Sequence, residues 1–315
     1  NIKSKFPVFK NNPNLVFLDT AASSLKVNQM IDATNNCYTN QYANIHRGNY
    51  ELSSKLTRNY EHSRKKVADY LNVSSKNIIF VKSATEGINL ISSCMSKSYF
   101  NKGDEIILSY LEHHANLIPW HLLNNQIKII PLNINEIGEI QYEDLNDKIN
   151  SKTKLITLTH MSNVTGSIID VEKVKEISKK KNIPLLLDGC QFAPHKKVNL
   201  NELDPDFYVF SAHKMYGPSG LGILYMKDNW IDMFPPYQGG GQMIHDVDIN
   251  KSTYAQGYEK FEAGTPPISQ VIGFASSIDF MNEANPNEIY KHEMNLHNYA
   301  MEKLLKFNKI KIYGE

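Results

Sequence analysis

The chain has 315 residues, of which 41% are hydrophobic and 21% charged, the composition of an ordinary globular protein. Its formal net charge of +1 gives no basic surplus, so no nucleic-acid partner is expected. The longest apolar runs, such as residues 183–187, are too short to span a bilayer, so no membrane partner is expected.

Short apolar runs alternate with longer amphipathic stretches along the chain. The short runs predict strands at residues 77–81, 105–109, 127–132, 154–159, 184–188, 207–211 and 222–226. The amphipathic stretches predict helices at residues 55–71, 86–97, 118–124, 171–181 and 289–307. This alternation predicts an α/β fold with a mostly parallel central sheet flanked by helices.

A polar segment at residues 282–287, which contains Pro286, is the best candidate for a domain boundary. We expect residues 15–282 to form a large domain that binds the cofactor. Residues 1–14 and 283–315, with a strand predicted at 309–313, are expected to form the remnant of an incomplete small domain.

The cysteines Cys37, Cys94 and Cys190 are odd in number and have neither disulfide-framework nor zinc-site spacing. They fit a reducing compartment. Their positions give no metal site.

Chemistry-bearing residues follow several of the predicted strands, at the edge where parallel α/β proteins bind ligands. After the strand at 77–81, Ser83, Ala84 and Thr85 lead into a helix, whose free N–H groups suit a phosphate. An ordinary helix cap is an equally good interpretation of this segment alone.

His113 follows the second strand and Asp188 ends the fifth. The His113 ring could lie over a flat cofactor, although a hydrogen-bonded, partly buried histidine is the commoner case. Asp188 needs a cationic or hydrogen-bonding partner, which a pyridinium nitrogen would supply, unless it caps the next element.

Lys214 comes three residues after a buried strand, where a surface lysine is not expected. Burial and a nearby cation favour the free amine that reacts with a carbonyl cofactor. The phosphate segment, the histidine, the aspartate and the lysine together predict a site for pyridoxal 5'-phosphate (PLP).

At this point the motifs resemble those of a known family, the SUF-type (group II) cysteine desulfurases, which are class V enzymes of PLP fold type I. The resemblance extends from about residue 6 to the end of the chain. The matching motifs are LDTAAS (18–23), ANIHRG (43–48), ATEGIN (84–89), EHHAN (112–116), THMSNVTG (159–166), DGCQ (188–191), SAHKMYG (211–217), QGGG (238–241) and FEAGTP (261–266).

The resemblance implies two catalytic residues: Lys214, which would bind PLP covalently and act as acid and base, and His113, which would stack on its ring. Asp188 would bind the ring nitrogen and Gln191 the phenolic oxygen. The resemblance also implies a phosphate site, to which Thr265 would come from the second subunit of a homodimer. The phosphate would be held by Ala84, Thr85, Ser211, His213 and Thr265.

Substrate contacts are implied as well: His46 and Arg47 at the mouth of the site, and Asn163 near the substrate carboxylate and the cofactor oxygen. The family carries its nucleophilic cysteine and a carboxylate-binding arginine beyond the point that corresponds to Glu315, so we expect the C-terminal part to be lacking here. Cys190 is expected to be a buried structural thiol, and Cys37 and Cys94 core residues.

The resemblance implies conversion of L-cysteine to L-alanine and a protein-bound persulfide, which supplies a sulfur-acceptor protein of the SUF system for iron–sulfur cluster assembly. The alternatives are a selenocysteine lyase or another class V PLP lyase, and a PLP-binding fragment or scaffold without complete chemistry. The Lys, Asn and Ile bias suggests a plastid-type, apicoplast-like organelle, with the cytoplasm as the other possibility.

Overall fold

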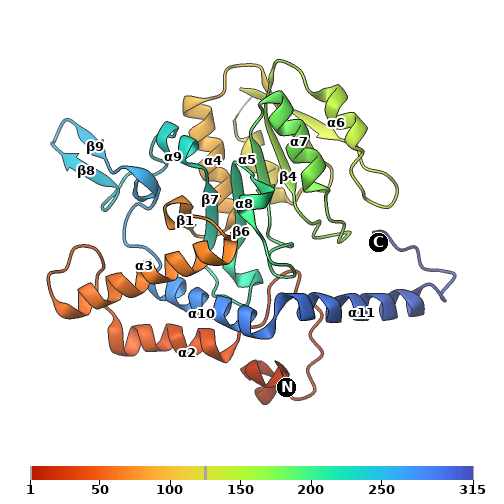
Figure 1. Cartoon of the computed structure of the whole chain (residues 1–315), viewed down its shortest axis with the longest axis horizontal. Helices are drawn as coiled ribbons and strands as arrows, with labels where there is room; N and C mark the ends of the chain where they lie inside the picture. The colour runs from red at the N-terminus through yellow and green to blue at the C-terminus, as the bar shows by residue number, and fades with distance from the viewer. Residues whose placement is uncertain (1, 124–125, 315) are drawn as a thin grey trace.

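The computed structural model describes residues 2–123 and 126–314. Within them, seven strands form a central sheet in the order β1-β7-β6-β5-β4-β2-β3 (Figure 1). The strands are β1 (Ile78–Val81), β2 (Asp104–Ser109), β3 (Ile127–Leu132), β4 (Thr153–Thr159), β5 (Leu185–Asp188), β6 (Phe207–Ser211) and β7 (Gly222–Met226). The two pairs that involve β7 are antiparallel and the other pairs are parallel. The predicted α/β fold with a mostly parallel sheet is therefore confirmed.

Helices surround this sheet (Figure 1). They are α1 (Pro7–Asn11), α2 (Asn28–Asn36), α3 (Glu51–Leu71), α4 (Ala84–Ser98), α5 (Ile118–His121), α6 (Tyr142–Lys148), α7 (Val171–Lys181), α8 (Leu200–Leu203), α9 (Asp228–Met233), α10 (Ile268–Ala284) and α11 (Pro286–Leu304). A π-helical turn (Cys37–Gln41) extends α2, and β8 (Ile244–Val247) and β9 (Ser252–Tyr254) form a separate hairpin. The end of the helix predicted at 118–124 lies outside the described residues.

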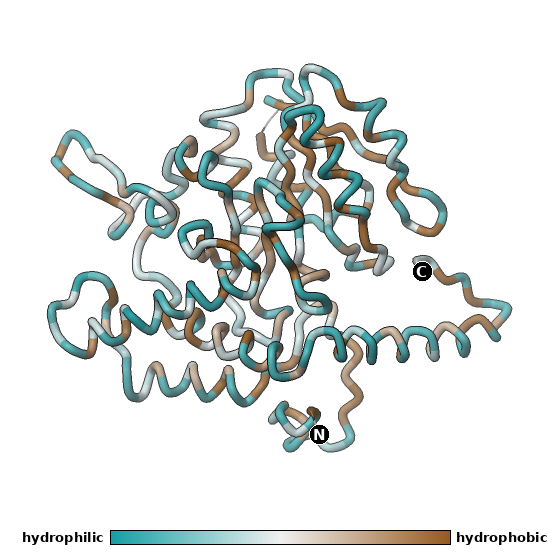
Figure 2. Tube along the Cα trace, viewed as in Figure 1, coloured by the Kyte–Doolittle hydropathy of each residue, from teal (hydrophilic) through white to brown (hydrophobic). Residues whose placement is uncertain are grey.

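Strand side chains alternate between two hydrophobic cores, one on each face of the sheet. In β6, Tyr208 and Phe210 enter the core that α3, α7 and α10 cover, whereas Phe207 and Val209 enter the core under α4, α5 and α9. Figure 2 shows the resulting concentration of hydrophobic residues along the central strands. Each large apolar side chain buried in this way contributes roughly 1.5–3 kcal/mol to stability.

Local sequence signals determine where the flanking helices begin and end. The Ser83 side chain caps α4 by accepting a hydrogen bond from the backbone N–H of Glu86, and Asp170 caps α7 through Lys173. Helix α7 ends at Asn182, which adopts the left-handed conformation (φ 54°) that asparagine tolerates better than most residues. These side chains therefore fix the first turns of α4 and α7.

The C-terminal region departs from one expectation. Helix α11 extends from the body of the molecule (Figure 1). It buries none of its side chains, although Glu293 pairs with His195 at 2.8 Å. Residues 309–313 form no strand, which corrects the prediction, because no described strand lies beside them to accept their backbone hydrogen bonds. Among the described helices, none has the length and apolar character needed to cross a bilayer.

Candidate active site

A cavity of about 550 Å³ lies at the carboxyl ends of β4, β5 and β6. Two groups of residues line it. The predicted ones are Ala84, Thr85, His113, Asn163, Asp188, Gln191, Ser211, His213 and Lys214. Those without a predicted role are Asp19, Ala21, Ala22, Ser83, Ala115, Thr159 and Cys190. The fold thus gathers residues from six separate sequence segments around one space.

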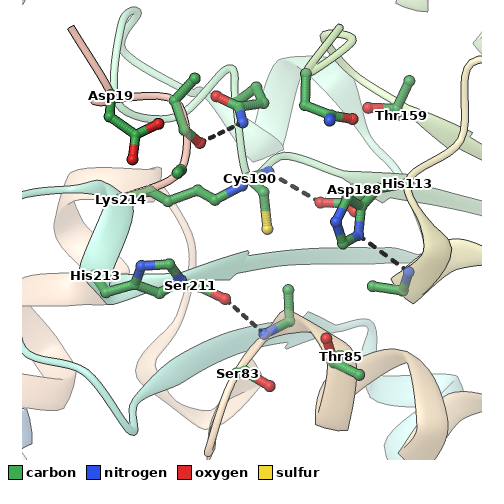
Figure 3. Close-up of a pocket in the computed structure, with 16 residues that line it drawn as sticks. Asp19, Ser83, Thr85, His113, Thr159, Asp188, Cys190, Ser211, His213 and Lys214 are labelled. Atoms are coloured by element: carbon green, nitrogen blue, oxygen red, sulfur yellow. Dashed lines mark hydrogen bonds between the residues drawn. The ribbon is translucent and has the colours of Figure 1, made fainter. Parts of the chain in front are cut away.

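Lys214 and Asp188 reach this cavity from adjacent strands (Figure 3). Asp188 is the last residue of β5, and β6 continues through Ser211 into a single 3-10 turn that ends at Lys214. The Asp188 side chain is only 3% exposed, and its Oδ1 accepts a hydrogen bond from the backbone N–H of Cys190 at 3.0 Å. A buried carboxylate that still faces a cavity is suited to a cationic ligand group.

His113 lies on the loop after β2 and faces the same cavity (Figure 3). Its Nδ1 accepts the backbone N–H of Ala115 at 3.1 Å, so the proton of the neutral ring resides on Nε2. Burial lowers the pKa of His113; Lys214 lowers it further and the Asp188 charge opposes the shift. The imidazole is therefore neutral at pH 7 and available for stacking.

Glu112, directly before His113, anchors this loop. Its carboxyl group accepts hydrogen bonds from Ser109 Oγ and Asn116 Nδ2, both at 2.6 Å. Burial raises the pKa of Glu112 to about 7, although these two hydrogen bonds oppose the shift. A carboxyl group that titrates near neutrality thus supports the histidine loop.

The N-terminus of α4 forms another wall of the cavity through Ser83, Ala84 and Thr85. The Ala84 N–H donates to Ser211 Oγ at 2.9 Å, which ties this helix to the end of β6. A helix of 15 residues presents a positive dipole end at its start, although the Ala84 and Glu86 N–H groups already donate to side chains. This wall is suited to an anion such as a phosphate group.

The N-terminal segment 19–22 lines another side of the cavity, and the sequence motifs gave it no role. Ala21 O accepts the Gln191 amide at 2.8 Å, and His213 Nδ1 lies 3.1 Å from Ser23 Oγ. Burial lowers the pKa of His213, as do the charges of Lys214 and Lys26. The LDTAAS motif was the available signal for this segment, but the motif alone does not show what it contacts.

His46, Arg47 and Thr265 do not line the Lys214 cavity of their own chain. His46 and Arg47 line a separate cavity of about 340 Å³, and Thr265 lines a third of about 280 Å³. Thr265 was predicted to act on a second subunit, and the single chain described here does not test that role. The substrate roles of His46 and Arg47 also remain predictions.

The cysteines lie in different surroundings. Cys37 and Cys94 are buried in the two cores, where burial raises the pKa of each thiol, for Cys94 to about 12. Cys190, expected to be buried and structural, is only partly buried and lines the cavity, because its side chain projects from the turn after Asp188 (Figure 3). Although the residue as a whole is partly exposed, desolvation of its thiol group, together with the charge of Asp188, holds the pKa of this thiol well above its usual value.

These groups fit PLP by the chemistry of the donor set: a lysine, a buried carboxylate for the ring nitrogen, a neutral imidazole and a helix N-terminus for the phosphate. With the fold, they define a PLP enzyme of fold type I.

Comparison with known proteins identifies the family. Residues 16–315 match the family model described as "Aminotransferase class-V". Cysteine desulfurases of Enterobacter sp. (strain 638) and Serratia proteamaculans (strain 568) are 37% and 38% identical, over 99% of this chain and 79% of their own. The apo cysteine desulfurase of Thermococcus onnurineus NA1 superposes with a TM-score of 0.94 at 32% identity, covering 100% of this chain and 78% of that one.

The cysteine desulfurase CsdA of Escherichia coli is similar as well, with a TM-score of 0.90 and 33% identity over 98% of this chain and 78% of its own. The chain therefore belongs to the class-V aminotransferase family, whose members use PLP, and within it to the cysteine desulfurases.

Proposed function

We propose that this chain is the cofactor-binding core of a SUF-type cysteine desulfurase, which converts L-cysteine to L-alanine and passes the sulfur to a thiol as a persulfide. The observation that carries the proposal is that Lys214, His113 and Asp188 face one cavity. The names of the relatives, at 37% and 38% identity, support the choice of substrate.

PLP, when bound, supplies an electron sink that makes the Cα–H bond of an amino acid acidic. In our proposal Asp188 binds the ring nitrogen and keeps it protonated. Lys214 holds the cofactor covalently and then moves the proton at Cα of the substrate. His113 covers the ring and assists this proton transfer.

The remaining residues of the cavity would bind and orient the cofactor and the substrate. The phosphate would be held by Ala84, Thr85, Ser211 and His213, next to the N-terminus of α4. Gln191 would hold the phenolic oxygen with the amide N–H that Ala21 leaves free. Asn163 would bind near the substrate carboxylate.

We further propose a homodimer in which exposed residues of one subunit complete the cavity of the other. Thr265, His46 and Arg47 are exposed and lie away from the Lys214 cavity of their own chain, which supports this arrangement. Thr265 would contact the phosphate, and His46 and Arg47 the substrate.

The sulfur would be transferred to a thiol other than those of the three cysteines in this sequence. A thiolate would attack the substrate sulfur, and its new S–S bond would replace the Cβ–S bond, whose electron pair stays with the carbon skeleton. A proton added at Cβ, and the Cα proton returned by Lys214, would then complete alanine. Only a thiolate is a good nucleophile, and burial raises the pKa of Cys37, Cys94 and Cys190. None of the three is proposed for this role.

We propose residues 15–282 as the large domain, with 1–14 and 283–315 belonging to a small one. The exposed helix α11, which begins at Pro286 shortly after this division, supports it. The sulfur would pass to an acceptor protein of the SUF system for iron–sulfur assembly. A plastid-type organelle is proposed as the site of action, from the Lys, Asn and Ile bias of the sequence.

The test is to incubate the full-length protein with L-cysteine and measure alanine and persulfide together. We expect equal amounts of both, and none from Lys214→Ala, whereas Lys97→Ala on the last turn of α4 should match the wild type. Alanine release that survives Lys214→Ala would refute the proposal. Alanine formed from L-selenocysteine but not from L-cysteine would instead favour a selenocysteine lyase.

A further inference from the structure

Arg64 of α3 is a fully buried cation, with 1% of its side chain exposed. Its two terminal nitrogens bind the Glu262 carboxylate at 2.7 and 2.8 Å, and Nη1 also donates to the carbonyl oxygen of Ile78 at 2.9 Å. The guanidinium lies 4.5 Å from the ring centre of Phe80 and 4.1 Å from that of Tyr258. This is the bidentate and stacked geometry that lysine cannot reproduce.

Through Glu262, Arg64 fixes the segment that leads to Thr265. Glu262 Oε1 also accepts the backbone N–H of Phe80 at 2.7 Å, which ties the segment to β1. Two residues further on, Gly264 N–H donates to Gly241 O at 2.8 Å. Thr265 follows directly and is exposed.

Through Glu61, Arg64 also fixes His46. Arg64 Nε donates to Glu61 Oε2 at 3.1 Å, and the other oxygen of Glu61 lies 3.0 Å from His46 Nε2. Although burial alone would raise the pKa of Glu61, the hydrogen bond from His46 and the charge of Arg64 lower it. The carboxylate is therefore ionised and bridges the two side chains.

The backbone of His46 has an uncommon conformation, which its surroundings must hold in place. His46 adopts φ +69°, in the left-handed region that few non-glycine residues occupy. Its N–H donates to Thr57 Oγ1 at 3.0 Å, so both the backbone and the ring are held by α3. The neighbouring Arg47 lines the 340 Å³ cavity together with Glu262.

The buried Arg64 thus connects two sets of predicted site residues that lie outside the Lys214 cavity. One set is His46 with Arg47, and the other is Thr265. A buried ion pair contributes little net stability compared with apolar residues of the same volume, so its value lies in fixing geometry. Glu61 and Glu262 are the two arms of this network, and each reaches one of the two sets.

We propose that Arg64 is a positioning residue that holds His46, Arg47 and Thr265 as one unit, and that this unit completes the Lys214 cavity of the partner subunit. The inference rests on the proposed function and its homodimer. It assigns separate effects to the two arms: Glu61 governs the substrate contacts of His46, and Glu262 the phosphate contact of Thr265.

The first test separates the arms in the full-length enzyme. Glu61→Ala should raise KM for L-cysteine about tenfold and leave PLP affinity unchanged, because one hydrogen bond to a charged group is of that size. Glu262→Gln should weaken PLP binding to the apoenzyme by about tenfold, and Arg64→Lys should do both. Lys66→Met is the matched control, because it removes an ion pair of the same helix, with Asp279 at 2.7 Å, and should do neither.

The second test asks in which subunit the unit acts, by pairing differently tagged chains. A Lys214→Ala chain paired with a Glu61→Ala chain should keep the substrate affinity of the wild-type site, because the intact unit serves the intact cavity. A chain that carries both changes, paired with a wild-type chain, should show the raised KM.

Equal KM values in the two pairings would overturn the proposal, as would a Glu61→Ala enzyme that melts like the wild type and has an unchanged KM. PLP binding is measured without substrate, so the Glu262 arm is tested even if the proposed reaction is wrong. Failure of wild-type desulfuration would refute the proposed function instead, independently of how PLP affinity responds.

Discussion

Lys26 Nζ donates a hydrogen bond, 2.8 Å long, to the carbonyl oxygen of His213, the residue directly before Lys214. The same oxygen accepts hydrogen bonds from Ser24 Oγ at 2.9 Å and from Ser24 N–H at 3.1 Å. Ser24 Oγ in turn accepts the backbone N–H of Tyr216 at 2.7 Å. The N-terminal segment therefore holds the backbone on both sides of Lys214.

Lys26→Met should lower kcat about threefold to tenfold while PLP stays bound, because the loss of one hydrogen bond loosens the backbone of Lys214. Lys26→Arg should restore most of this activity, since it keeps a donor at this place. Single-turnover kinetics with L-cysteine measure the effect. A wild-type rate in Lys26→Met would contradict the positioning role.

Lys26 should also affect how the free energy of unfolding depends on pH. Burial lowers the pKa of Lys26 to about 8, so between pH 8 and 10.5 the unfolded chain binds more protons than the folded one. Stability relative to Lys26→Met should therefore rise with pH across this window and be constant below pH 8. Urea unfolding at several pH values measures this difference, with Lys97→Met, at an exposed lysine in the last turn of α4, as control.

Glu112 gives the opposite pH dependence. Because burial raises its pKa to about 7, from 4.5, the stability that the protonated form contributes is complete below pH 4.5 and is lost as the pH rises through 7. Glu112→Gln mimics the protonated form. It should become more stable than the wild type over this range, by up to about 3 kcal/mol.

The Glu112 measurement is urea unfolding of both proteins at pH 4.5 and 8. Glu143→Gln, at a side chain that is 85% exposed, serves as the control and should show no such gap. A stability difference that is the same at both pH values would show that Glu112 is ionised in the folded protein.

Cys190 should not receive the sulfur, although it lines the cavity. Burial holds the pKa of its thiol far above neutrality, so the thiolate is scarce at pH 7. Cys190→Ala should keep PLP and still release alanine at a rate within about threefold of the wild type. Mass spectrometry after incubation with L-cysteine should find no added sulfur on the Cys190 peptide, and its presence there would reverse this assignment.

The sequence predicted the sheet well, because each strand is a short apolar run with its own boundaries. All seven predicted strands of the sheet agree to within one residue with the observed ones, and the residues after them meet at one edge by the topology of a parallel sheet. The position of Lys214 at the cavity follows from this rule.

Other features depend on tertiary contacts that no local pattern reveals. Lys26 meets His213 across 187 positions of sequence, and Arg64 meets Glu262 across 198. In the sequence, Lys26 lies on a segment typical of a polar surface, and Arg64 lies on a segment typical of an amphipathic helix. Residues 309–313 failed as a predicted strand for the same reason, since a strand needs a neighbour that its own sequence does not specify.

Chemical trapping of the cofactor tests whether Lys214 carries PLP. The holoenzyme is treated with sodium borohydride, which makes the bond between cofactor and lysine permanent, and its peptides are then analysed by mass spectrometry. If Lys214 carries PLP, the pyridoxyl phosphate mass should lie on the peptide that contains Lys214, and Lys214→Ala should carry no label. Label on another lysine, such as Lys26, or no label in a protein that retains bound PLP, would contradict it.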